Sequence, residues 1–435
     1  MKREGWKQFK FEDITISLKR GPFGGDLKKS FFVESGYRVY EQQHAINNDF
    51  TLGRYFIDEE RFQKLKACAV GPGDYIVSCS GTMGRIARLP ENAPIGVINQ
   101  ALLRIRINED LINPKYFIDF FRSKIFQNEI LRDSRGSGMQ NMAGIKEIKP
   151  ILIELPPLPE QRAIVAKIEQ LFSELDNGIA NLKAAQEQLK VYRLSVLSAV
   201  MSSKNIVPLS DIIEDLSQGW SPKCLNKASE DKDEWAVIKT TAVQPGKYVE
   251  AENKILPDSL EPRIQHEIQS GDILITRAGP RVRVGICCLV KATRPKLINC
   301  DKVYRIKPNK NRIVPEFLEY SLNSAEQLRK IERMKTGSSD SGLNLTQSRF
   351  VKLKIPLPSL KEQNQTVQEI ESRFSVCDKI EESITESLIK AEALRQSILK
   401  KAFAGELLSE KELKACRKEP DWEPAENLLE RLMKT

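Results

Sequence analysis

A long stretch occurs twice in this chain, and the repeat constrains the fold more than any other feature of the sequence. Ile153-Glu-Leu-Pro-Pro-Leu-Pro-Glu-Gln-Arg opens the first copy, and Ile355-Pro-Leu-Pro-Ser-Leu-Lys-Glu-Gln-Asn opens the second. From Glu160 and Glu362 onward the copies keep a constant offset of 202 residues, the difference between these two numbers, without a gap. Both copies are therefore expected to form the same structural element.

Each copy is predicted to be one long helix, because prolines block helix upstream and strong helix formers follow. Apolar residues then recur with the three-and-four spacing of a heptad seam. In the first copy the seam consists of Val165, Ile168, Phe172, Leu175, Ile179, Leu182, Leu189, Val196 and Val200. In the second copy it consists of Val367, Ile370, Phe374, Cys377, Ile384, Leu388, Ala391, Ile398 and Ala402. Two helices of equal length and phase most simply pack on each other.

The direction of the two helices follows from their length. A helix from Glu160 to Met201 would be roughly 60 Å long at ~1.5 Å per residue, whereas the link over residues 202–206 spans at most about 18 Å. The second globular segment should therefore begin at the far end of the first helix. The expected fold class is α+β, a dumbbell of two β-rich domains separated by two long antiparallel coiled-coil helices. It would be an internal duplication with pseudo-two-fold symmetry.

The globular segments alternate short β-type runs with turn residues. In the first segment the runs are Tyr37–Tyr40, Asp74–Ser78, Ile86–Leu89, Gly96–Asn99 and Ala101–Ile107, and a single helix is expected from Pro114 to about Leu131. The second segment repeats this order. The predicted domains are a first globular domain over residues 1–154, a central helix over 155–203, a second globular domain over 204–356, a distal helix over 357–405 and a C-terminal tail over 406–435. The tail should form a short amphipathic helix that packs near the first domain or on a partner.

Composition narrows the class of protein. The chain has 435 residues, enough for two domains with their own cores, and no apolar run approaches the ~20 residues of a membrane span. We expect a cytoplasmic protein that does not contact a membrane. The 8 cysteines include no CxxC pair, so reduced and mostly buried thiols are expected rather than disulfides or zinc. A net charge of +9 suits a polyanionic partner, although many basic proteins bind no nucleic acid.

The full arrangement resembles a known family. The first helix opens Leu155-Pro-Pro-Leu-Pro-Glu-Gln-Arg, the second ends Leu399-Lys-Lys-Ala-Phe-Ala-Gly-Glu-Leu, and Asp421-Trp-Glu-Pro-Ala follows. With a globular domain before each helix, this layout resembles the specificity subunit of type I restriction-modification systems over nearly the whole chain. The resemblance implies that each globular part is a target-recognition domain that binds one half of a bipartite, asymmetric sequence in double-stranded DNA.

The same resemblance implies the partners. The helices would hold two modification subunits, docked on outer faces that carry Arg162, Lys167, Glu169, Lys183 and Lys190. Those subunits would methylate adenine with S-adenosylmethionine, and two restriction subunits, where present, would use ATP and Mg²⁺ for cleavage. This chain itself would bind no cofactor and no metal ion.

The residues also indicate a chain without an active site. The two histidines, His44 and His266, lie in different contexts, so a shared histidine-based acid, base or metal site is not expected. Gln244-Pro-Gly-Lys lacks the first glycine and the hydroxyl residue of a nucleotide-binding P-loop. A second hypothesis, from another class, is a non-catalytic coiled-coil adaptor whose β-rich domains bind protein. Salt-dependent, sequence-selective DNA binding would separate the two hypotheses.

DNA contacts are expected from loops that combine small residues with Arg, Lys, Gln, Asn, Ser and Thr, or else these loops are simply solvated turns. In the first domain the candidates are Arg20, Lys28, Lys29, Gln42, Gln43, Ser80, Thr82, Arg85, Arg135, Ser137, Gln140 and Asn141. In the second domain they are Gln218, Trp220, Lys223, Lys239, Arg277, Arg281, Arg283, Lys335, Ser338 and Asn344. Because corresponding loops differ in sequence, the two half-sites should be unrelated.

Overall fold

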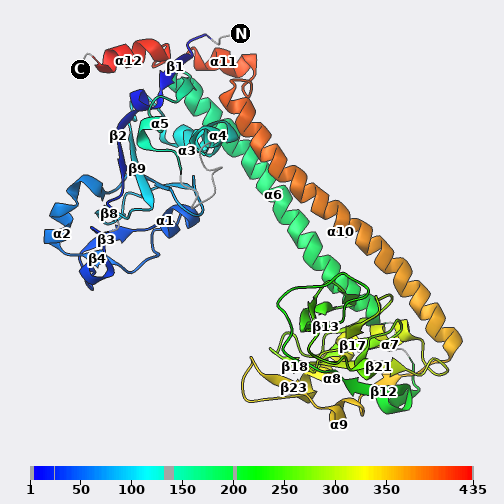
Figure 1. The fold of residues 1–435 in the computed structure, drawn as a ribbon. Coiled ribbons are helices and arrows are strands. Elements are labelled where there is room, and N and C mark those ends of the chain that lie inside the picture. The colour runs from blue at the N-terminus through cyan, green and yellow to red at the C-terminus, as the bar shows by residue number, and fades with distance from the viewer. Residues whose placement is uncertain (1–3, 24, 132–141, 199–202, 434–435) are drawn as a thin grey trace. The chain divides into compact units, whose positions relative to one another are not determined.

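The computed structural model describes residues 4–23, 25–131, 142–198 and 203–433. The chain divides into two compact units (Figure 1). Unit 1 consists of Met1–Asn181 and Ser387–Thr435, and unit 2 consists of Leu182–Glu386. Both boundaries fall inside the long helices α6 (Leu158–Val196) and α10 (Leu360–Phe403), which are the two copies of the repeat. No helix among the described residues is long and apolar enough to cross a membrane.

Unit 1 contains two four-stranded sheets and a strand pair. Its strands are β1 (Lys7–Lys10), β2 (Thr15–Arg20), β3 (Tyr37–Tyr40), β4 (Phe56–Ile57), β5 (Ala69–Val70), β6 (Tyr75–Ser78), β7 (Ile86–Arg88), β8 (Gly96–Ile98), β9 (Leu102–Ile107) and β10 (Leu152–Leu155). One sheet has the antiparallel order β2-β9-β6-β7, and the other has the order β4-β3-β8-β5 with β3 and β8 parallel. The pair β1-β10 ties the N-terminal segment to the start of α6. All five β-type runs predicted for this segment are confirmed as strands.

Two helices replace the single helix expected from Pro114 to Leu131, so that prediction was wrong. The chain forms α3 (Pro114–Arg122) and α4 (Lys124–Ile130), separated by Ser123. Ser123 has extended backbone angles (φ −67°, ψ 145°), and its hydroxyl accepts the N–H of Phe126, which makes it the N-cap of α4. The remaining short helices of the globular part are α1 (Gln42–Asn47), α2 (Glu59–Lys64) and α5 (Ile145–Ile148).

The C-terminal segment completes the core of unit 1, which confirms the expectation that it packs near the first domain. It forms α11 (Glu410–Cys416) and α12 (Ala425–Met433), with Leu413, Cys416 and Leu428 buried in the same apolar cluster as strand and helix residues of the globular part. The N–H of Ala425 donates to the carbonyl of Gly5 at 3.0 Å, so both ends of the described chain lie together. Figure 1 shows α11 and α12 beside β1.

Unit 2 has more numerous, shorter strands. They are β11 (Ile206–Pro208), β12 (Ile213–Gln218), β13 (Ala236–Ile238), β14 (Val243–Gln244), β15 (Lys247–Tyr248), β16 (Asn253–Ile255), β17 (Ile273–Thr276), β18 (Ala278–Gly279), β19 (Cys287–Leu289), β20 (Leu297–Ile298), β21 (Val303–Pro308), β22 (Lys335–Thr336), β23 (Leu343–Leu345) and β24 (Lys354–Pro356). The main sheet has the antiparallel order β12-β21-β17-β19, and β11 pairs with β24. Three-stranded sheets β16-β13-β20 and β18-β23-β22 and the hairpin β14-β15 complete the unit.

The helices of unit 2 repeat the break seen in unit 1. They are α7 (Pro315–Leu322), α8 (Ala325–Met334) and α9 (Gln347–Phe350). Ser324 is extended (φ −66°, ψ 149°) and caps α8 by accepting the N–H of Gln327, as Ser123 caps α4. All 8 cysteines of the chain are free thiols; seven are buried and Cys224 is partly exposed, as expected from the sequence.

A buried glutamine fastens α6 to the globular part of unit 1. Gln161, in the Glu-Gln pair that opens the repeat, is fully buried. Its side-chain N–H groups donate to the carbonyls of Leu111 (3.1 Å) and Pro156 (2.9 Å), and its side-chain oxygen accepts the N–H of Asn113 (2.7 Å). All three partners are backbone groups that would otherwise be left without a hydrogen bond where the proline turn meets the loop before α3. Gln161 therefore holds the start of α6 to the domain.

Gln363 does the same for α10 in unit 2, and it is also fully buried. It donates to the carbonyls of Arg312 (3.1 Å) and Pro358 (2.9 Å) and accepts the N–H of Val314 (2.8 Å). The three bonds agree with those of Gln161 in partner type and, within 0.1 Å, in length. The two helix roots are therefore built alike.

An arginine of one long helix binds the other helix within unit 1. The guanidinium of Arg395 lies 4.5 Å from the ring centroid of Phe172 and pairs with the carboxylate of Asp176. The predicted seam residues near these contacts, Ile168 and Ile398, are buried. Stacking and an ion pair thus join α6 to α10 beside the apolar seam.

The residues at the same repeat positions make the same contacts in unit 2. Arg193 lies over the ring of Phe374 at 5.3 Å and pairs with Asp378 at 2.7 Å. Glu381 is a second carboxylate partner at 3.1 Å. Arg193, Arg395 and Glu381 are therefore interhelical contacts.

Candidate nucleic-acid interface

Three of the candidate loops of unit 1 meet at the turn between β8 and β9. The N–H of Asn99 donates to the carbonyl of Tyr40, just before α1, at 3.0 Å, and the N–H of Cys79 donates to the carbonyl of Ala101 at 2.8 Å. Gly21 lies against the same turn, where a Cβ atom would come 1.8 Å from the carbonyl oxygen of Asn99. Only glycine fits there. The loops over residues 19–29 and 78–85 therefore lie together with the start of α1, which carries Gln42 and Gln43 on a helix and not on the predicted loop.

Hydrogen bonds fix the loop after β6. The hydroxyl of Ser78 donates to the carbonyl of Thr82 (2.6 Å) and accepts the N–H of Arg85 (3.1 Å). Gln42 reaches across from α1 and donates to the hydroxyl of Ser80 at 3.3 Å. The loop is thus held in shape from inside, while the side chains of Thr82 and Arg85 are exposed.

Several predicted contact residues of unit 1 present unengaged polar groups. Lys28 and Lys29 are exposed and Arg20 is half-buried, and among the described residues none of their charged groups forms a hydrogen bond or ion pair. Gln43 is engaged instead with the carboxylate of Glu41 at 2.9 Å. Cations without a carboxylate partner are the groups that suit phosphate.

Four predicted residues of the first domain, Arg135, Ser137, Gln140 and Asn141, lie outside the described residues. The described chain resumes at Met142, whose N–H donates to the carbonyl of Cys79 at 3.2 Å. Met142 therefore lies beside the loop after β6.

The candidate loops of unit 2 meet at the equivalent turn. A Cβ atom at Gly219 would come 1.8 Å from the carbonyl oxygen of Asn299, the same close approach as at Gly21. The N–H of Trp220 donates to the carbonyl of Asn299 at 2.9 Å. The N–H of Arg277 donates to the carbonyl of Lys302 (2.8 Å), and its carbonyl accepts the N–H of Leu345 (2.7 Å). The loops over residues 218–223, 276–283 and 335–344 thus share one origin.

Several predicted cations of unit 2 are engaged inside the domain. The guanidinium of Arg283 donates to the carbonyls of Thr240 (2.7 Å) and Val243 (2.8 Å). The side chain of Lys335 is only 8% exposed, and its ammonium donates to the carbonyl of Arg281 at 2.9 Å. These two side chains stabilise the conformation of the loops, because they donate their hydrogen bonds to backbone carbonyls of the same domain.

Two further predicted cations of unit 2 face carboxylates. Arg281 pairs with Asp340 at 2.9 Å and with Glu332, and these partners raise the pKa of its guanidinium. Lys239 lies 3.4 Å from a carboxylate oxygen of Glu252. These ion pairs are exposed, so they can exchange for a phosphate contact at little cost.

The remaining predicted residues of unit 2 are accessible. Lys223, Ser338 and Asn344 are exposed. The Nε of Arg277 donates to the side-chain oxygen of Gln218 at 3.3 Å, which prearranges two groups that can read base edges.

Four residues that the structure brings forward were not among the predicted site residues: Phe23, Arg263, Gln161 and Gln363. Phe23 is 88% exposed in the loop after β2. Arg263 stacks over the ring of Trp220 at 4.5 Å, a pairing between distant segments that no sequence spacing reveals. The two glutamines could have been found, because the Glu-Gln pair opens both copies of the repeat.

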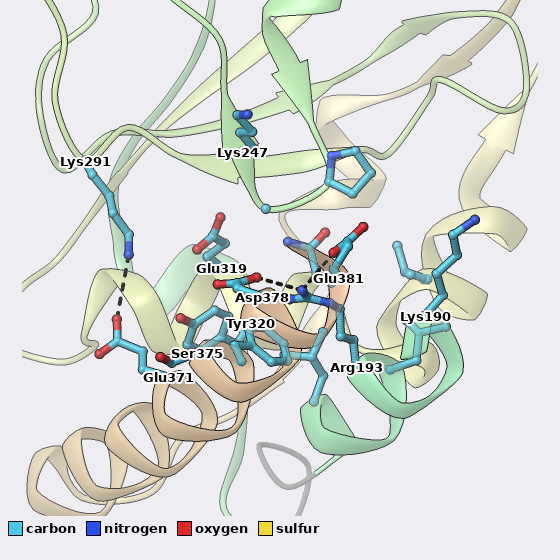
Figure 2. Close-up of a pocket in the computed structure, with 17 residues that line it drawn as sticks. Lys190, Arg193, Lys247, Lys291, Glu319, Tyr320, Glu371, Ser375, Asp378 and Glu381 are labelled. Carbon is cyan, nitrogen blue, oxygen red and sulfur yellow. Dashed lines mark hydrogen bonds and ion pairs between the residues drawn. The ribbon is translucent and has the colours of Figure 1, made fainter. Parts of the chain in front are cut away.

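Unit 2 also contains a cavity of about 1040 Å³ among α6, α7, α10 and the β14-β15 hairpin (Figure 2). Its walls carry charges of both signs, and two of the cations face carboxylates on the wall: Arg193 faces Asp378, and Lys291 lies 3.7 Å from Glu371. Glu319 points into it, and burial raises the pKa of this carboxyl to about 7 although it accepts the N–H of Leu289. A charge-balanced cavity does not suit a polyanion.

The buried histidine of unit 1 does not provide a catalytic group. His44 is fully buried, and its Nε2 lies 2.7 Å from the carbonyl oxygen of Leu52. A carbonyl only accepts, so Nε2 carries the proton and Nδ1 accepts the N–H of Glu41 at 2.9 Å. Nδ1 thus caps the start of α1 and Nε2 holds the loop after it, so neither nitrogen is available as a base or metal ligand.

A protein-family model described as "Type I restriction modification DNA specificity domain" matches this chain twice, over residues 3–184 and 201–390. The specificity subunit of the type I restriction enzyme EcoKI from Escherichia coli is 26% identical over 94% of this chain and 90% of its own length. The EcoEI specificity subunit, also from Escherichia coli, is 41% identical over 40% of this chain, but this match spans only 29% of that relative.

Solved structures share the fold. A chain from a structural study of complex assembly and conformational transition of the type I R-M system superimposes with a TM-score of 0.66, at 20% identity, over 93% of this chain and 99% of that chain. The HsdS subunit from Thermoanaerobacter tengcongensis superimposes with a TM-score of 0.51, also at 20% identity, over 93% and 98% of the two chains.

Proposed function

This chain belongs to the type I restriction-modification DNA specificity family, and from that premise we propose that each of its two units binds one half of a bipartite, asymmetric target in double-stranded DNA. The observation that carries the proposal is the common origin of the candidate loops. In each unit these loops leave the domain beside one turn, where Gly21 or Gly219 packs on the backbone of Asn99 or Asn299. Such a cluster gathers phosphate-binding cations and base-reading amides on one patch.

Within this patch we assign different roles to the predicted residues. The open groups of Arg20, Lys28, Lys29, Arg85 and Lys223 would bind phosphate or guanine, and Gln42, Gln218, Ser338 and Asn344 would contact base edges. The residues engaged with backbone carbonyls, Arg283 and Lys335, would instead hold the loops in their reading shape. We retain Arg135, Gln140 and Asn141 as readers of the first half-site on their chemistry alone.

We further propose that the chain is an internal duplication with pseudo-two-fold symmetry, with α6 and α10 as an antiparallel coiled coil. Residues 202 positions apart support this, because Arg193 and Arg395 make the same ion pair and ring contact, each with the other helix. The target-recognition domains would extend over residues 1–154 and 204–356. The helices over 155–203 and 357–405 and the tail over 406–435 would form the scaffold.

The outer faces of the helices are the proposed docking surface for two modification subunits. Apolar side chains stay exposed there, among them Val191 and Tyr192 on α6 and Val376 and Ile389 on α10. Two cations expected on this face also bind the C-terminal tail: Arg162 binds Asp421 through two hydrogen bonds, and Lys167 pairs with Glu412 of α11. Both ion pairs are partly exposed, so they can exchange for contacts with a partner at little cost.

The proposal assigns all chemistry to the partners. The modification subunits would use S-adenosylmethionine, and a pair of restriction subunits, where present, would use ATP and Mg²⁺. This chain would supply recognition and hold the partners at the DNA in the cytoplasm.

DNA binding by the chain with its modification partner tests the proposal. We expect tight binding to DNA that carries the methylated motif, with log affinity falling linearly with log salt concentration, and binding at least 10³-fold weaker to unrelated DNA. Changing one half-site should weaken binding without altering the preference at the other. Binding that is insensitive to sequence and to salt would instead support a protein-interaction adaptor.

A further inference from the structure

Phe23 is the most exposed large apolar side chain in the part of the chain that the structure describes, with 88% of its surface open to solvent. An aromatic ring left this open gives up the stabilisation that burial would provide. Single exposed apolar residues are common and need no explanation by themselves. The position of Phe23 is what makes its exposure informative.

The loop that carries Phe23 is anchored on both sides of the ring. Gly21 is locked against the carbonyl of Asn99, and the next residue, Pro22, is buried. Beyond the ring, Leu27 is 7% exposed and packs in an apolar cluster of the unit. The N–H of Asp26 donates to the carbonyl of Phe23 at 2.9 Å. The ring therefore projects from a fixed base at the point where the candidate loops meet.

Cations flank Phe23 along the chain. Lys19, Arg20, Lys28 and Lys29 flank it in the sequence, and Asp26 is the one acidic residue between positions 19 and 29. The net positive charge of this stretch disfavours a basic partner. It suits a surface that presents anions around an apolar interior. Duplex DNA is such a surface, because phosphates border the stacked bases.

We propose that Phe23 is a wedge residue that enters a base step of the first half-site and partly unstacks it. This inference rests on the proposed function, since it requires the loop to face DNA. Apolar side chains that enter base steps cost some stacking energy, and the cost is offset by burial of the ring and by the added phosphate contacts that a deformed duplex allows. Neighbouring lysines would bind the phosphates on either side of the opened step.

Among its described residues, the second unit has no equivalent free ring. Trp220 follows the corresponding Gly219, but the guanidinium of Arg263 covers its face at 4.5 Å, and the indole packs against an apolar cluster of the domain. A covered and partly buried ring cannot enter the stack without losing both contacts. The wedge should therefore act at one half-site only.

The test uses the complex of this chain with its modification partner, bound to DNA in which 2-aminopurine replaces each purine of the target in turn. Unstacking raises 2-aminopurine fluorescence, so we expect a rise at one step of the first half-site and none at the corresponding step of the second. Phe23→Ala should abolish the rise and weaken binding about tenfold or more, whereas Phe23→Trp should keep the rise. Ile16→Ala, which removes a 71% exposed apolar side chain from β2 outside the loop, should change neither.

The outcomes separate the wedge from the proposed function. Sequence-selective binding whose affinity and fluorescence are unchanged in Phe23→Ala would overturn the wedge and leave the function intact. Failure of the wild-type complex to select any sequence would overturn the function itself. If Phe23→Ala released the modification partner, as measured by the mass of the complex, the ring would be covered by protein, and the wedge would again be overturned.

Discussion

The two units agree at the roots of their long helices and differ at the candidate DNA-contact loops. Gln161 and Gln363 form the same three hydrogen bonds with backbone groups at nearly the same lengths. The loop Gly81-Thr-Met-Gly-Arg in unit 1, by contrast, corresponds to Gly279-Pro-Arg-Val-Arg in unit 2. Hydrogen bonds with buried backbone groups fix the domain cores and the helix roots, which together form the frame of the protein. The exposed loops are free to change which bases they read.

The loops can diverge because each begins at a fixed point. Asn99 and Asn299 occupy the same turn in the two units, and the glycine packed on each turn sets the start of the neighbouring loop. Substitutions beyond that point change the presented side chains without moving the frame. We therefore expect variants of the frame to act alike in both units and variants of the loops to act on one unit only.

The largest effect is expected at the helix roots. Gln161→Leu and Gln363→Leu each leave two carbonyls and one N–H buried without a partner, at about 1–3 kcal/mol per group. We expect either variant to lower the free energy of unfolding by at least about 3 kcal/mol. Hydrogen exchange measured by mass spectrometry in peptides around residues 108–116 and 309–317 would report the loss separately for each unit.

Exposed glutamines on the same helices provide the control. Gln170→Leu on α6 and Gln365→Leu on α10 remove side chains that are open to solvent, so they should leave exchange at both roots unchanged. A large loss for Gln161→Leu with none for Gln363→Leu would mean that the two roots are not equivalent.

A smaller effect, confined to unit 2, is expected at Glu319. Burial raises the pKa of its carboxyl from the ordinary value of 4.5 to about 7. The folded state therefore holds this proton more tightly than the unfolded state. The stability linked to it is fully present below pH 4.5 and is lost as pH rises to about 7. Glu319→Gln should abolish this loss and stabilise the protein by about 2–3 kcal/mol above pH 7, with no gain below pH 4.5.

Urea unfolding of wild type and Glu319→Gln at pH 5 and pH 8 would measure the difference. Unit 1 places an acid one position along the equivalent helix, where burial raises the pKa of Asp119 to about 6 while Arg122 opposes the shift. Asp119→Asn should likewise raise the free energy of unfolding. This increase should reach its full size by about pH 6 rather than pH 7. If the free energies of unfolding of Glu319→Gln and wild type differed by the same amount at every pH, the raised pKa of Glu319 would be contradicted.

The smallest effect is expected where arginine joins the long helices. Arg193→Lys and Arg395→Lys keep the charge but lose the planar group that lies over Phe374 and Phe172. Each variant should lower the free energy of unfolding by about 1 kcal/mol. The two decreases should be equal if the contacts are equivalent. Urea unfolding of the single and double variants would check this, and a double variant that costs much more than the sum would show that the two contacts are coupled.

Much of the frame could be predicted from the sequence, because periodicity and repetition report directly on helices and strands. The break at Ser123 was missed although serine is a common N-cap, since the apolar pattern continues across it. The pairing of Arg162 with Asp421 and the burial of Lys335 join segments far apart in the chain, and no spacing rule reveals such contacts. For the same reason the sequence could name candidate loop residues but could not tell free cations from engaged ones.

The central claim, that one frame carries two different readers, is tested most directly by sequencing adenine methylation in DNA from cells that contain this chain and its modification partner. We expect one bipartite motif with unrelated half-sites. Arg85→Ala should relax the first half-site alone, and Arg277→Ala the second alone. A perfectly palindromic motif, or a single loop variant that alters both half-sites, would contradict the account.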